Sequence, residues 1–445
     1  MNDYRLVADA VAADIAAGRL RPGEQLPPQR IFARKAGIAN STASRVYQEL
    51  NRRGLTVGEV GRGTFVRTAD APVAPVLSDP KDNSVDLELN YPVVPEQSAL
   101  LAKDITALLR PDAFGAAVRP VGAVGTPAAR IAAAALASRG GWRPDPDQIV
   151  FAGNGRQMIA AALAALVPRG ARLGVEEFSY PLVKAIADQL GITLVPLPVD
   201  EDGLLPDAVA AAHRSAPLRA VYLQPTLHNP LSFITSEPRR VALAEVFADC
   251  GVYAVEDAVW AFLREDLPPF AALAPDTTVL VDSLSKRLVP GMTLGFAVAP
   301  RPLLTDIAVA LRSGGWTPMR FALEAATAWT TSGTVATIAQ AKREDAMLRQ
   351  ATAQRELVNF AVRGNPASYY CWWELPRPWR ADTFVTAAAR QGIAVTPAAA
   401  FTVGTTRAPN AVRLALASPR LDALSRALRT LADIARATPD TLVAE

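Results

Sequence analysis

The stretch "VDSLSKRLVPGMTLGF", residues 281–296, places Lys286 in a Ser-x-Ser-Lys turn that Pro290 and Gly291 close. The apolar run "TVLVD" that leads into this turn is typical of a buried strand. A lysine is usually a solvated surface residue, but a lysine after a buried strand can also act as a nucleophile toward a carbonyl compound. The other strand ends of the chain decide between these two interpretations.

Beyond residue 115, short apolar runs alternate with longer stretches of helical periodicity. The runs are QIVFAG (148–153), ARLGVEE (171–177), TLVPL (193–197), RAVYLQP (219–225), VYAVED (252–257), TVLVDS (278–283) and GFAVAP (295–300). Helices are expected between several of them, for example over residues 156–166 and 180–190. The alternation predicts an α/β fold with a mostly parallel, buried sheet, and in such sheets ligands bind at the carboxyl ends of the strands.

Residues with cofactor chemistry fall at these strand ends. Gly153 and Gly155 end one strand and open a helix, which suits a phosphate held by backbone N–H groups. Asp257 ends another strand, and Asn229 and Lys286 follow two more. Together these groups indicate a pocket for pyridoxal 5′-phosphate (PLP), in which the lysine forms the Schiff base and the aspartate keeps the ring nitrogen protonated. Lys286 is therefore predicted to anchor a cofactor.

Residues 115–435 resemble the fold-type I aminotransferases, because residues 283–291 match the motif S-x-S-K-x-x-x-P-G. The resemblance implies that Lys286 is the catalytic Schiff-base lysine, that Asp257 pairs with the pyridine nitrogen, and that Asn229 bonds the ring hydroxyl oxygen. It also implies that Tyr180 stacks on the ring and that Arg413 binds the carboxylate of a substrate or effector. The implied phosphate-binding residues are Gly155, Arg156, Gln157, Ser283 and Ser285.

Two positions depart from the pattern of that family. Trp260, also expected at the cofactor, stands where the family usually has a tyrosine that bonds the ring oxygen; an indole can donate a hydrogen bond but is not a phenol. Thr293 stands where an arginine normally neutralises the cofactor phosphate. Arg287 and Arg156 are the nearest candidates in the sequence to replace that charge.

The first seventy residues have a different pattern. Helices are predicted over residues 3–17, 29–36 and 40–53, and they are followed by the β signals "LTVGEV" and "TFV" around a Gly-Arg-Gly turn. Three helices and a hairpin form a winged helix-turn-helix, in which the third helix enters the major groove of DNA. Residues 1–68 carry 11 Lys+Arg and 6 Asp+Glu, whereas the rest of the chain carries 35 and 37. The positive charge is thus concentrated where nucleic acid would bind.

Residues 3–67 resemble the DNA-binding domain of the GntR family of bacterial regulators. The motifs G-R-L-x-P-G-x-x-L-P and G-x-G-T-F-V occur in order at 18–27 and 61–66. The family often has an arginine at the start of the recognition helix, where this chain has Ala-Asn-Ser-Thr at 39–42, so we expect a different base preference. The residues that the resemblance implies at DNA are Arg30, Arg34, Ser41, Thr42, Arg45 and Arg62.

The expected organisation is a winged-helix domain at 1–68, a linker at 69–86 rich in Pro, Ala and Asp, and an aminotransferase-like domain at 87–445. Within the last, a large α/β subdomain is expected at about 115–310 and a smaller C-terminal one at about 320–440. The fold class is thus α/β, with an N-terminal winged helix-turn-helix. This fusion is the arrangement of the MocR-type regulators.

Three functions follow from these resemblances. The first is a DNA-binding transcription regulator that senses a small amine, an amino acid or PLP itself through its aminotransferase-like domain. The second is an active PLP-dependent aminotransferase, and the third is a regulator whose aminotransferase-like domain is a cofactor-free dimerisation scaffold. We favour the first over an enzyme, because a DNA-binding domain has little purpose in plain metabolism. The fold implies a homodimer, and hence double-stranded DNA with two half-sites.

Composition narrows the remaining possibilities. The chain has two cysteines, Cys250 and Cys371, and two histidines, His213 and His228, so neither a disulfide framework nor a metal site is expected. No apolar run approaches the length of a membrane helix, and acidic residues interrupt the N-terminal stretch, unlike in a signal peptide. We therefore expect no membrane partner and a cytoplasmic location.

Overall fold

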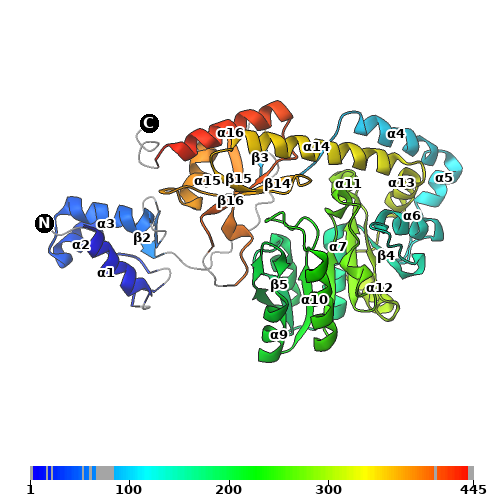
Figure 1. Cartoon of the computed structure of the whole chain (residues 1–445), viewed down its shortest axis with the longest axis horizontal. Helices are drawn as coiled ribbons and strands as arrows, with labels where there is room; N and C mark the ends of the chain where they lie inside the picture. The colour runs from blue at the N-terminus through cyan, green and yellow to red at the C-terminus, as the bar shows by residue number, and fades with distance from the viewer. Residues whose placement is uncertain are drawn as a thin grey trace. The chain divides into compact units, whose positions relative to one another are not determined.

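The computed structural model describes residues 4–16, 19–21, 24–52, 55–59, 63–66, 85–404 and 408–438. The chain divides into two compact units, residues 1–76 and 77–445 (Figure 1). Arg62 and residues 69–84 of the expected linker lie outside the described ranges. Within those ranges, none of the helices has both the length and the apolar character needed to cross a lipid bilayer.

The N-terminal unit is a winged helix-turn-helix, as predicted. Its elements are α1 (Tyr4–Ala16), α2 (Gln29–Ala36), α3 (Asn40–Arg52), β1 (Thr56–Glu59) and β2 (Gly63–Val66). Gly37 caps α2 with a φ of 64°, a left-handed conformation that glycine adopts at low cost, and this allows the tight turn into α3. Val46 and Leu50 of α3 are fully buried against α1 and β2. The opposite side of α3 is therefore free to face a ligand.

All seven apolar runs of the C-terminal region form strands of one sheet. These strands are β4 (Ile149–Ala152), β5 (Arg172–Glu176), β6 (Thr193–Leu197), β9 (Leu218–Leu223), β10 (Tyr253–Asp257), β11 (Thr278–Ser283) and β12 (Gly295–Val298). Their order is β4-β12-β11-β10-β9-β5-β6. Only β12 runs antiparallel to its neighbours, so the expected mostly parallel sheet is confirmed.

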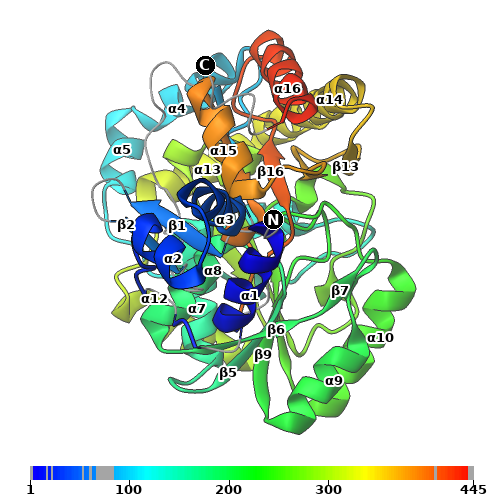
Figure 2. The same cartoon turned by 90° about the vertical axis from the view of Figure 1, so that its left-hand side faces the viewer.

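Helices cover both faces of this sheet. One face packs against α7 (Gly155–Leu166), α8 (Pro181–Leu190) and α12 (Leu304–Ser313). The other packs against α6 (Pro127–Ala137) and α13 (Arg320–Thr331) at one end, and against α9 (Pro206–Ser215) and α10 (Glu237–Cys250) at the other. Figure 2 shows α9 and α10 lying side by side beyond β9. Because helices bury both faces, the strands are apolar throughout.

The smaller subdomain is built on a five-stranded sheet of order β13-β14-β16-β15-β3. Its strands are β13 (Ala361–Arg363), β14 (Tyr370–Glu374), β15 (Ile393–Pro397), β16 (Ala411–Ala415) and β3 (Val85–Leu87), with helices α15 (Ala381–Arg390) and α16 (Leu421–Arg436). The 23-residue helix α14 (Thr334–Glu356) leads from the large subdomain to α16 (Figure 1). Strand β3 begins at Val85 and pairs in parallel with β15, so the last two residues of the expected linker belong to a sheet.

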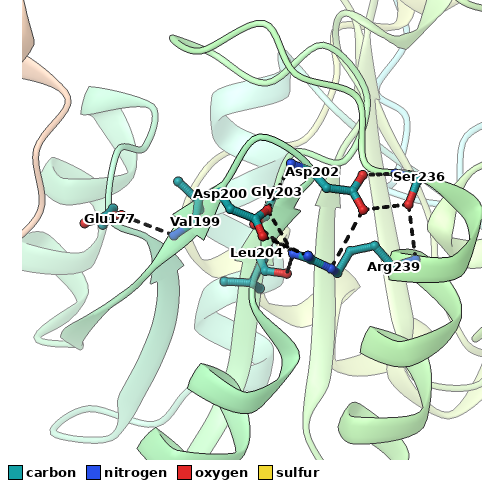
Figure 3. A network of polar contacts seen from close by, with 8 residues as sticks. All are labelled: Glu177, Val199, Asp200, Asp202, Gly203, Leu204, Ser236 and Arg239. Carbon is teal, nitrogen blue, oxygen red and sulfur yellow. Dashed lines mark hydrogen bonds and ion pairs between the residues drawn. The ribbon is translucent and has the colours of Figure 1, made fainter.

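A polar network holds the start of α10, where the loop that follows β9 ends (Figure 3). Arg239 in the first turn of α10 forms an ion pair with Asp200 at 2.9 Å. Asp202 accepts hydrogen bonds from the backbone N–H and the hydroxyl of Ser236, the N-cap residue of α10. The hairpin formed by β7 (Val199–Asp200) and β8 (Gly203–Leu204) thus holds the start of α10 in place through these contacts. The end of the preceding loop is held with it.

The large subdomain should not tolerate a side chain at Gly295. A Cβ there would lie 2.3 Å from the carbonyl carbon and oxygen of Asn154, directly before α7. We expect Gly295→Ala to lower the free energy of unfolding by about 1–3 kcal/mol, the usual cost of overpacking, as measured by urea denaturation. Gly291→Ala is the control, because its Cβ would meet no atom within 4 Å. Equal stability of the two variants would contradict this close contact.

Candidate functional site

Five of the six predicted DNA-contacting residues lie on two helices of the N-terminal unit, and the sixth, Arg62, lies outside the described residues. Arg30 and Arg34 of α2 and Ser41 and Arg45 of α3 are exposed, and Thr42 of α3 is half-buried. Because α3 buries its apolar side against the domain core, these residues are free to meet phosphates and base edges. They form a polar and basic surface in the helix-turn-helix itself, which is where this class of domain reads DNA.

In the C-terminal unit, the predicted pocket residues come from the carboxyl ends of neighbouring strands. Tyr180 follows β5, Asn229 follows β9, Asp257 ends β10, and Lys286 follows β11 on the short helix α11 (Leu284–Arg287). Because these strands are adjacent and parallel, their carboxyl ends meet at one edge of the sheet. Arg413 joins them from β16 of the smaller sheet.

Lys286 lies between backbone and aromatic rings. Its Nζ donates a hydrogen bond to the carbonyl oxygen of Asn90, 2.7 Å away. The same atom lies 4.9 Å from the ring centre of Tyr91 and 5.6 Å from that of Trp260. Lys286 is therefore not the solvated loop residue that a lysine usually is.

The surroundings of Lys286 favour its neutral form. Burial, together with the guanidinium groups of Arg156 and Arg413, lowers the pKa of Lys286 to about 7. A neutral amine is the nucleophilic form of lysine, so a substantial fraction of this side chain can react with a carbonyl group near neutral pH. An exposed lysine, with a pKa of about 10.4, has almost no such fraction.

Asp257 is buried and held by three hydrogen bonds. It accepts them from the hydroxyl of Tyr222 at 2.5 Å, from Nε2 of Gln224 at 3.0 Å and from the backbone N–H of Val259 at 3.1 Å. Burial raises the pKa of Asp257, while these hydrogen bonds act in the opposite direction. The three donors fix the orientation of the carboxyl group and favour its ionised form, in which it can pair with a cation.

Arg413 and Asn229 contact each other across the two subdomains. Nη1 of Arg413 donates to Oδ1 of Asn229 at 3.2 Å, and Nη2 donates to the carbonyl oxygen of Glu88 and to Oγ1 of Thr396. Burial lowers the pKa of Arg413 to about 10. The side chain still carries its charge at neutral pH, and it brings a guanidinium from the small sheet to the edge of the large one.

The start of α7 lies close to Ser283, which in turn contacts Ser285. Asn154 caps the helix by accepting the backbone N–H of Gln157 at 3.0 Å. A Cβ at Gly155 would lie 2.9 Å from Cβ of Ser283, so the glycine allows the helix to approach β11 closely. The hydroxyl of Ser283 accepts the backbone N–H of Ser285 at 3.0 Å. Helix N-terminal N–H groups and hydroxyls together suit a phosphate.

The two arginines that could neutralise a phosphate, Arg287 and Arg156, have different surroundings. Arg287 forms a buried ion pair with Asp282 at 2.7 Å, and it is therefore engaged elsewhere. Arg156 lies close enough to Lys286 and to Tyr180 to shift the pKa of both, so it is the candidate beside the pocket. Sequence proximity does not reveal that Asp282, five residues before Arg287, forms an ion pair with that side chain.

The two aromatic residues of the prediction differ in their surroundings. Burial raises the pKa of the Tyr180 hydroxyl, and a hydrogen bond with Arg156 acts in the opposite direction. Trp260 is buried, and its ring centre lies 6.0 Å from that of Tyr369 and 5.7 Å from that of Tyr370. Trp260 therefore belongs to a group of packed aromatic rings next to Lys286.

Four pocket residues were not anticipated. Asn90 and Tyr91 contact Lys286, and Tyr222 and Gln224 hold Asp257. The last two sit at the end of the run "RAVYLQP", where a buried tyrosine and glutamine needed polar partners, so this signal was present in the sequence. Asn90 and Tyr91 follow directly after the expected linker, and only the tertiary structure brings them to Lys286.

The chemical groups at this edge of the sheet suit a molecule that carries an aldehyde, a phosphate and a carboxylate. Lys286 supplies a reactive amine, Arg156 and Arg413 supply positive charge, and Asp257 is a fixed carboxylate. Buried charges are costly unless they find partners, and Nε of Arg413 is buried without a hydrogen-bond partner. This set of donors matches the groups of PLP and of an amino acid.

Solved structures with a similar fold are aminotransferases. An archaeal alanine:glyoxylate aminotransferase superposes with a TM-score of 0.72 at 22% identity, covering 79% of this chain and 91% of that one. The α-aminoadipate aminotransferase LysN from Thermus thermophilus, solved with N-(5′-phosphopyridoxyl)-L-leucine, gives 0.71 at 21% identity, covering 82% and 94%. At these identities the comparison establishes the fold.

Relatives by sequence are named as regulators. YdeF of Bacillus subtilis, an uncharacterised HTH-type transcriptional regulator, is 29% identical over 96% of this chain and 93% of its own length. The pyridoxine biosynthesis regulator PdxR of Corynebacterium glutamicum is 29% identical over 65% and 64%. The probable rhizopine catabolism regulator MocR of Rhizobium meliloti is 27% identical over 68% and 66%.

Two family matches divide the chain as its fold does. Residues 3–66 match the bacterial regulatory proteins of the gntR family, and residues 85–431 match the aminotransferases of class I and II. The chain therefore belongs to the aminotransferase class I and II family and carries a gntR-type DNA-binding domain in front of that fold, which is the arrangement of the MocR-type transcription regulators.

Proposed function

We propose that this DNA-binding regulator holds PLP through Lys286 and senses a small amine or amino acid at the same pocket. One arrangement carries the proposal: Lys286, whose pKa is lowered to about 7 by burial and by two nearby arginines, follows the strand next to the one that ends at the hydrogen-bonded Asp257. A pocket with these groups attracts an anionic aldehyde, and it also supplies the amine with which an aldehyde reacts.

Each ring contact of PLP has a candidate residue. Lys286 supplies the anchoring amine, Asp257 a carboxylate for the ring nitrogen, Asn229 an amide for the ring oxygen, and Tyr180 an aromatic face. Trp260 lies near Lys286 as well, and its indole takes the place that a phenol has in related enzymes. When bound, PLP supplies an electron sink that stabilises carbanions; the residues of this chain orient it and keep its charges balanced.

The phosphate would be held without an arginine at position 293. The N-terminal N–H group of α7 at Gly155 and the hydroxyls of Ser283 and Ser285 supply hydrogen bonds. Gln157 lies in the same first turn of α7, where its own backbone N–H donates to Asn154. Thr293 adds a further hydroxyl, 3.2 Å from that of Ser283. Arg156 supplies the charge, because it is the residue of this group that bears one. Charge-assisted hydrogen bonds contribute about 1.5–3 kcal/mol each, so Arg156 should matter more than any single hydroxyl.

The pocket supports sensing better than a scaffold role. Burying Lys286 near Arg156 and Arg413 places like charges close together, which costs free energy that an apolar core would not cost. A domain that served only for dimerisation would gain stability by losing them. Arg413 favours an effector with a carboxylate over a simple amine, because a guanidinium binds carboxylates with paired hydrogen bonds. Turnover of an amino donor and a keto acid would instead identify an aminotransferase.

The proposed assembly is a homodimer on DNA with two half-sites. Apolar side chains are exposed on consecutive helices of the C-terminal unit, namely Leu109, Phe114, Val118 and Ile131. They lie on or directly after α4 (Gln97–Leu108), α5 (Pro111–Ala117) and α6. Exposed apolar residues that form one surface patch typically mark a protein interface, and we propose this role for these four residues. Two-fold symmetry of the protein would be matched by paired half-sites in the DNA.

Added PLP should give the purified protein a visible absorption band in the near-violet, since a Schiff base with a protein amine absorbs there. We expect Lys286→Ala to abolish the band. Lys103→Ala, which changes an exposed lysine, is the matched control and should keep it. A wild-type protein without a band at saturating PLP would rule out the proposed cofactor.

The rate at which this band appears should depend on pH in a characteristic way. Only the neutral amine of Lys286 attacks an aldehyde, and its pKa is lowered to about 7. Between pH 6 and pH 8 the rate should therefore rise roughly tenfold and then level off, since a unit of pH below a pKa changes the neutral fraction about tenfold. Stopped-flow absorbance measures the rate. A rate that still rises steeply above pH 9 would indicate an ordinary lysine.

A further inference from the structure

Two of the three cationic side chains at this site, Lys286 and Arg413, donate hydrogen bonds to the same short segment of backbone. Nζ of Lys286 donates to the carbonyl oxygen of Asn90 at 2.7 Å, and Nη2 of Arg413 donates to the carbonyl oxygen of Glu88. The two acceptors are two residues apart, although the two donors come from different subdomains. We call residues 88–91 the latch segment. A ligand group that binds the donors of Lys286 and Arg413 therefore competes with the latch segment for both of them.

The latch segment follows directly after β3, which is the first described element after the stretch that leads from the DNA-binding domain. Strand β3 pairs with β15 and buries Leu87 in the small-subdomain core. Several hydrogen bonds hold it in place. The backbone N–H groups of Glu88 and Leu89 donate to Oδ1 of Asp86 at 2.7 and 2.9 Å, and the hydroxyl of Ser418 donates to the carbonyl oxygen of Leu89. The backbone N–H of Ala417 donates to Oδ1 of Asn90 at 3.2 Å, and the backbone N–H of Tyr91 donates to the hydroxyl of Ser418 at 3.1 Å.

The hydrogen bonds of Arg413 leave no free position for a bidentate carboxylate. A guanidinium binds a carboxylate through two nitrogens at one edge, either Nη1 with Nη2 or Nε with Nη2, and both edges need a hydrogen of Nη2. The two hydrogens of Nη2 already go to Glu88 and Thr396. A carboxylate that binds in this way must therefore release one of these two acceptors.

Lys286 faces the same competition. Condensation of its neutral amine with an aldehyde forms a carbon–nitrogen double bond, and the aldehyde oxygen leaves as water with the two hydrogens of the amine. The nitrogen then carries one proton at most. A bound PLP would offer its own oxygen as an acceptor for that proton, and the carbonyl oxygen of Asn90 would then lose its hydrogen bond from Lys286.

We infer that the latch segment is displaced by ligand groups bound at Lys286 and Arg413, and that this displacement moves the start of the connection to the DNA-binding domain. The inference rests on the proposed PLP function. It gives a physical path from the pocket to residue 85, because the same four residues contact both pocket cations and continue directly from β3. A regulator needs such a differential contact in order to change state with its ligand.

The test is hydrogen–deuterium exchange of the full-length protein, read from peptides that cover residues 85–91. Three conditions are compared: no addition, PLP alone, and PLP with succinate, a carboxylate that carries no amine and so cannot replace the Lys286 nitrogen. We expect PLP to speed exchange in residues 85–91 at least threefold, and succinate to speed it further. Lys286→Arg, which keeps a donor but cannot condense with an aldehyde, should show no response to PLP.

A second variant tests the anchoring of the latch segment without any ligand. Ser418→Ala removes the acceptor of the Tyr91 N–H and the hydroxyl that donates to the carbonyl oxygen of Leu89. We expect exchange in residues 85–91 to be at least threefold faster than in the wild type. The matched control is Ser425→Ala in α16, which loses a hydrogen bond to Glu356, the last residue of α14. This variant should leave the peptide unchanged.

The outcomes separate the two proposals. A visible PLP band with unchanged or slower exchange in residues 85–91 would overturn the latch and leave the cofactor function intact. Absence of the band would overturn both. If Ser418→Ala exchanged like the wild type, the hydrogen bonds of Ser418 would not hold the segment, and the latch would again be refuted. Faster exchange in both experiments supports it.

Discussion

The chemistry of this site depends on one arrangement: a lysine is buried near two arginines at the carboxyl edge of a mostly parallel sheet. Lys286 lies close enough to Arg156 and to Arg413 for each guanidinium to lower the pKa of the amine, and burial adds to the cost of the charges on Lys286 and Arg413. The sheet tolerates this because each cation is given a defined partner: carbonyl oxygens for Lys286 and Arg413, and the hydroxyl of Tyr180 for Arg156. The arrangement remains poised for an anionic ligand, which would relieve the repulsion.

The turn that carries Lys286 is supported from behind by a second buried lysine. Lys342 of α14 donates to the carbonyl oxygens of Lys286 and Leu288, and burial lowers its pKa to about 7. Seven residues further along the same helix, Arg349 donates to the carbonyl oxygen of Leu416 at 2.7 Å, close to the end of β16. One helix thus supports both the turn of the reactive lysine and the strand of Arg413, so the distance between the two depends on a rigid element.

Much of this could be predicted from the sequence, because the strong signals are local. Apolar runs bounded by turn residues identified all seven strands of the main sheet, and polar residues at or shortly after the ends of three of these runs gave Asn229, Asp257 and Lys286 as neighbours. The sequence could not reveal partners that only the tertiary structure supplies. The pairing of Arg287 with Asp282 and the contact of Asn90 with Lys286 are of that kind, since neither residue type nor spacing indicates which group occupies a buried donor.

The most direct test of the central claim is the affinity for DNA with and without a pocket ligand. Fluorescence anisotropy would give the Kd of the full-length protein for the DNA upstream of its own gene, alone and with PLP and an amino acid. The account predicts a change in Kd of about fivefold or more, the lower end of typical allosteric couplings, and no change for Lys286→Ala. An identical Kd, at PLP concentrations where the visible band shows full binding, would contradict it.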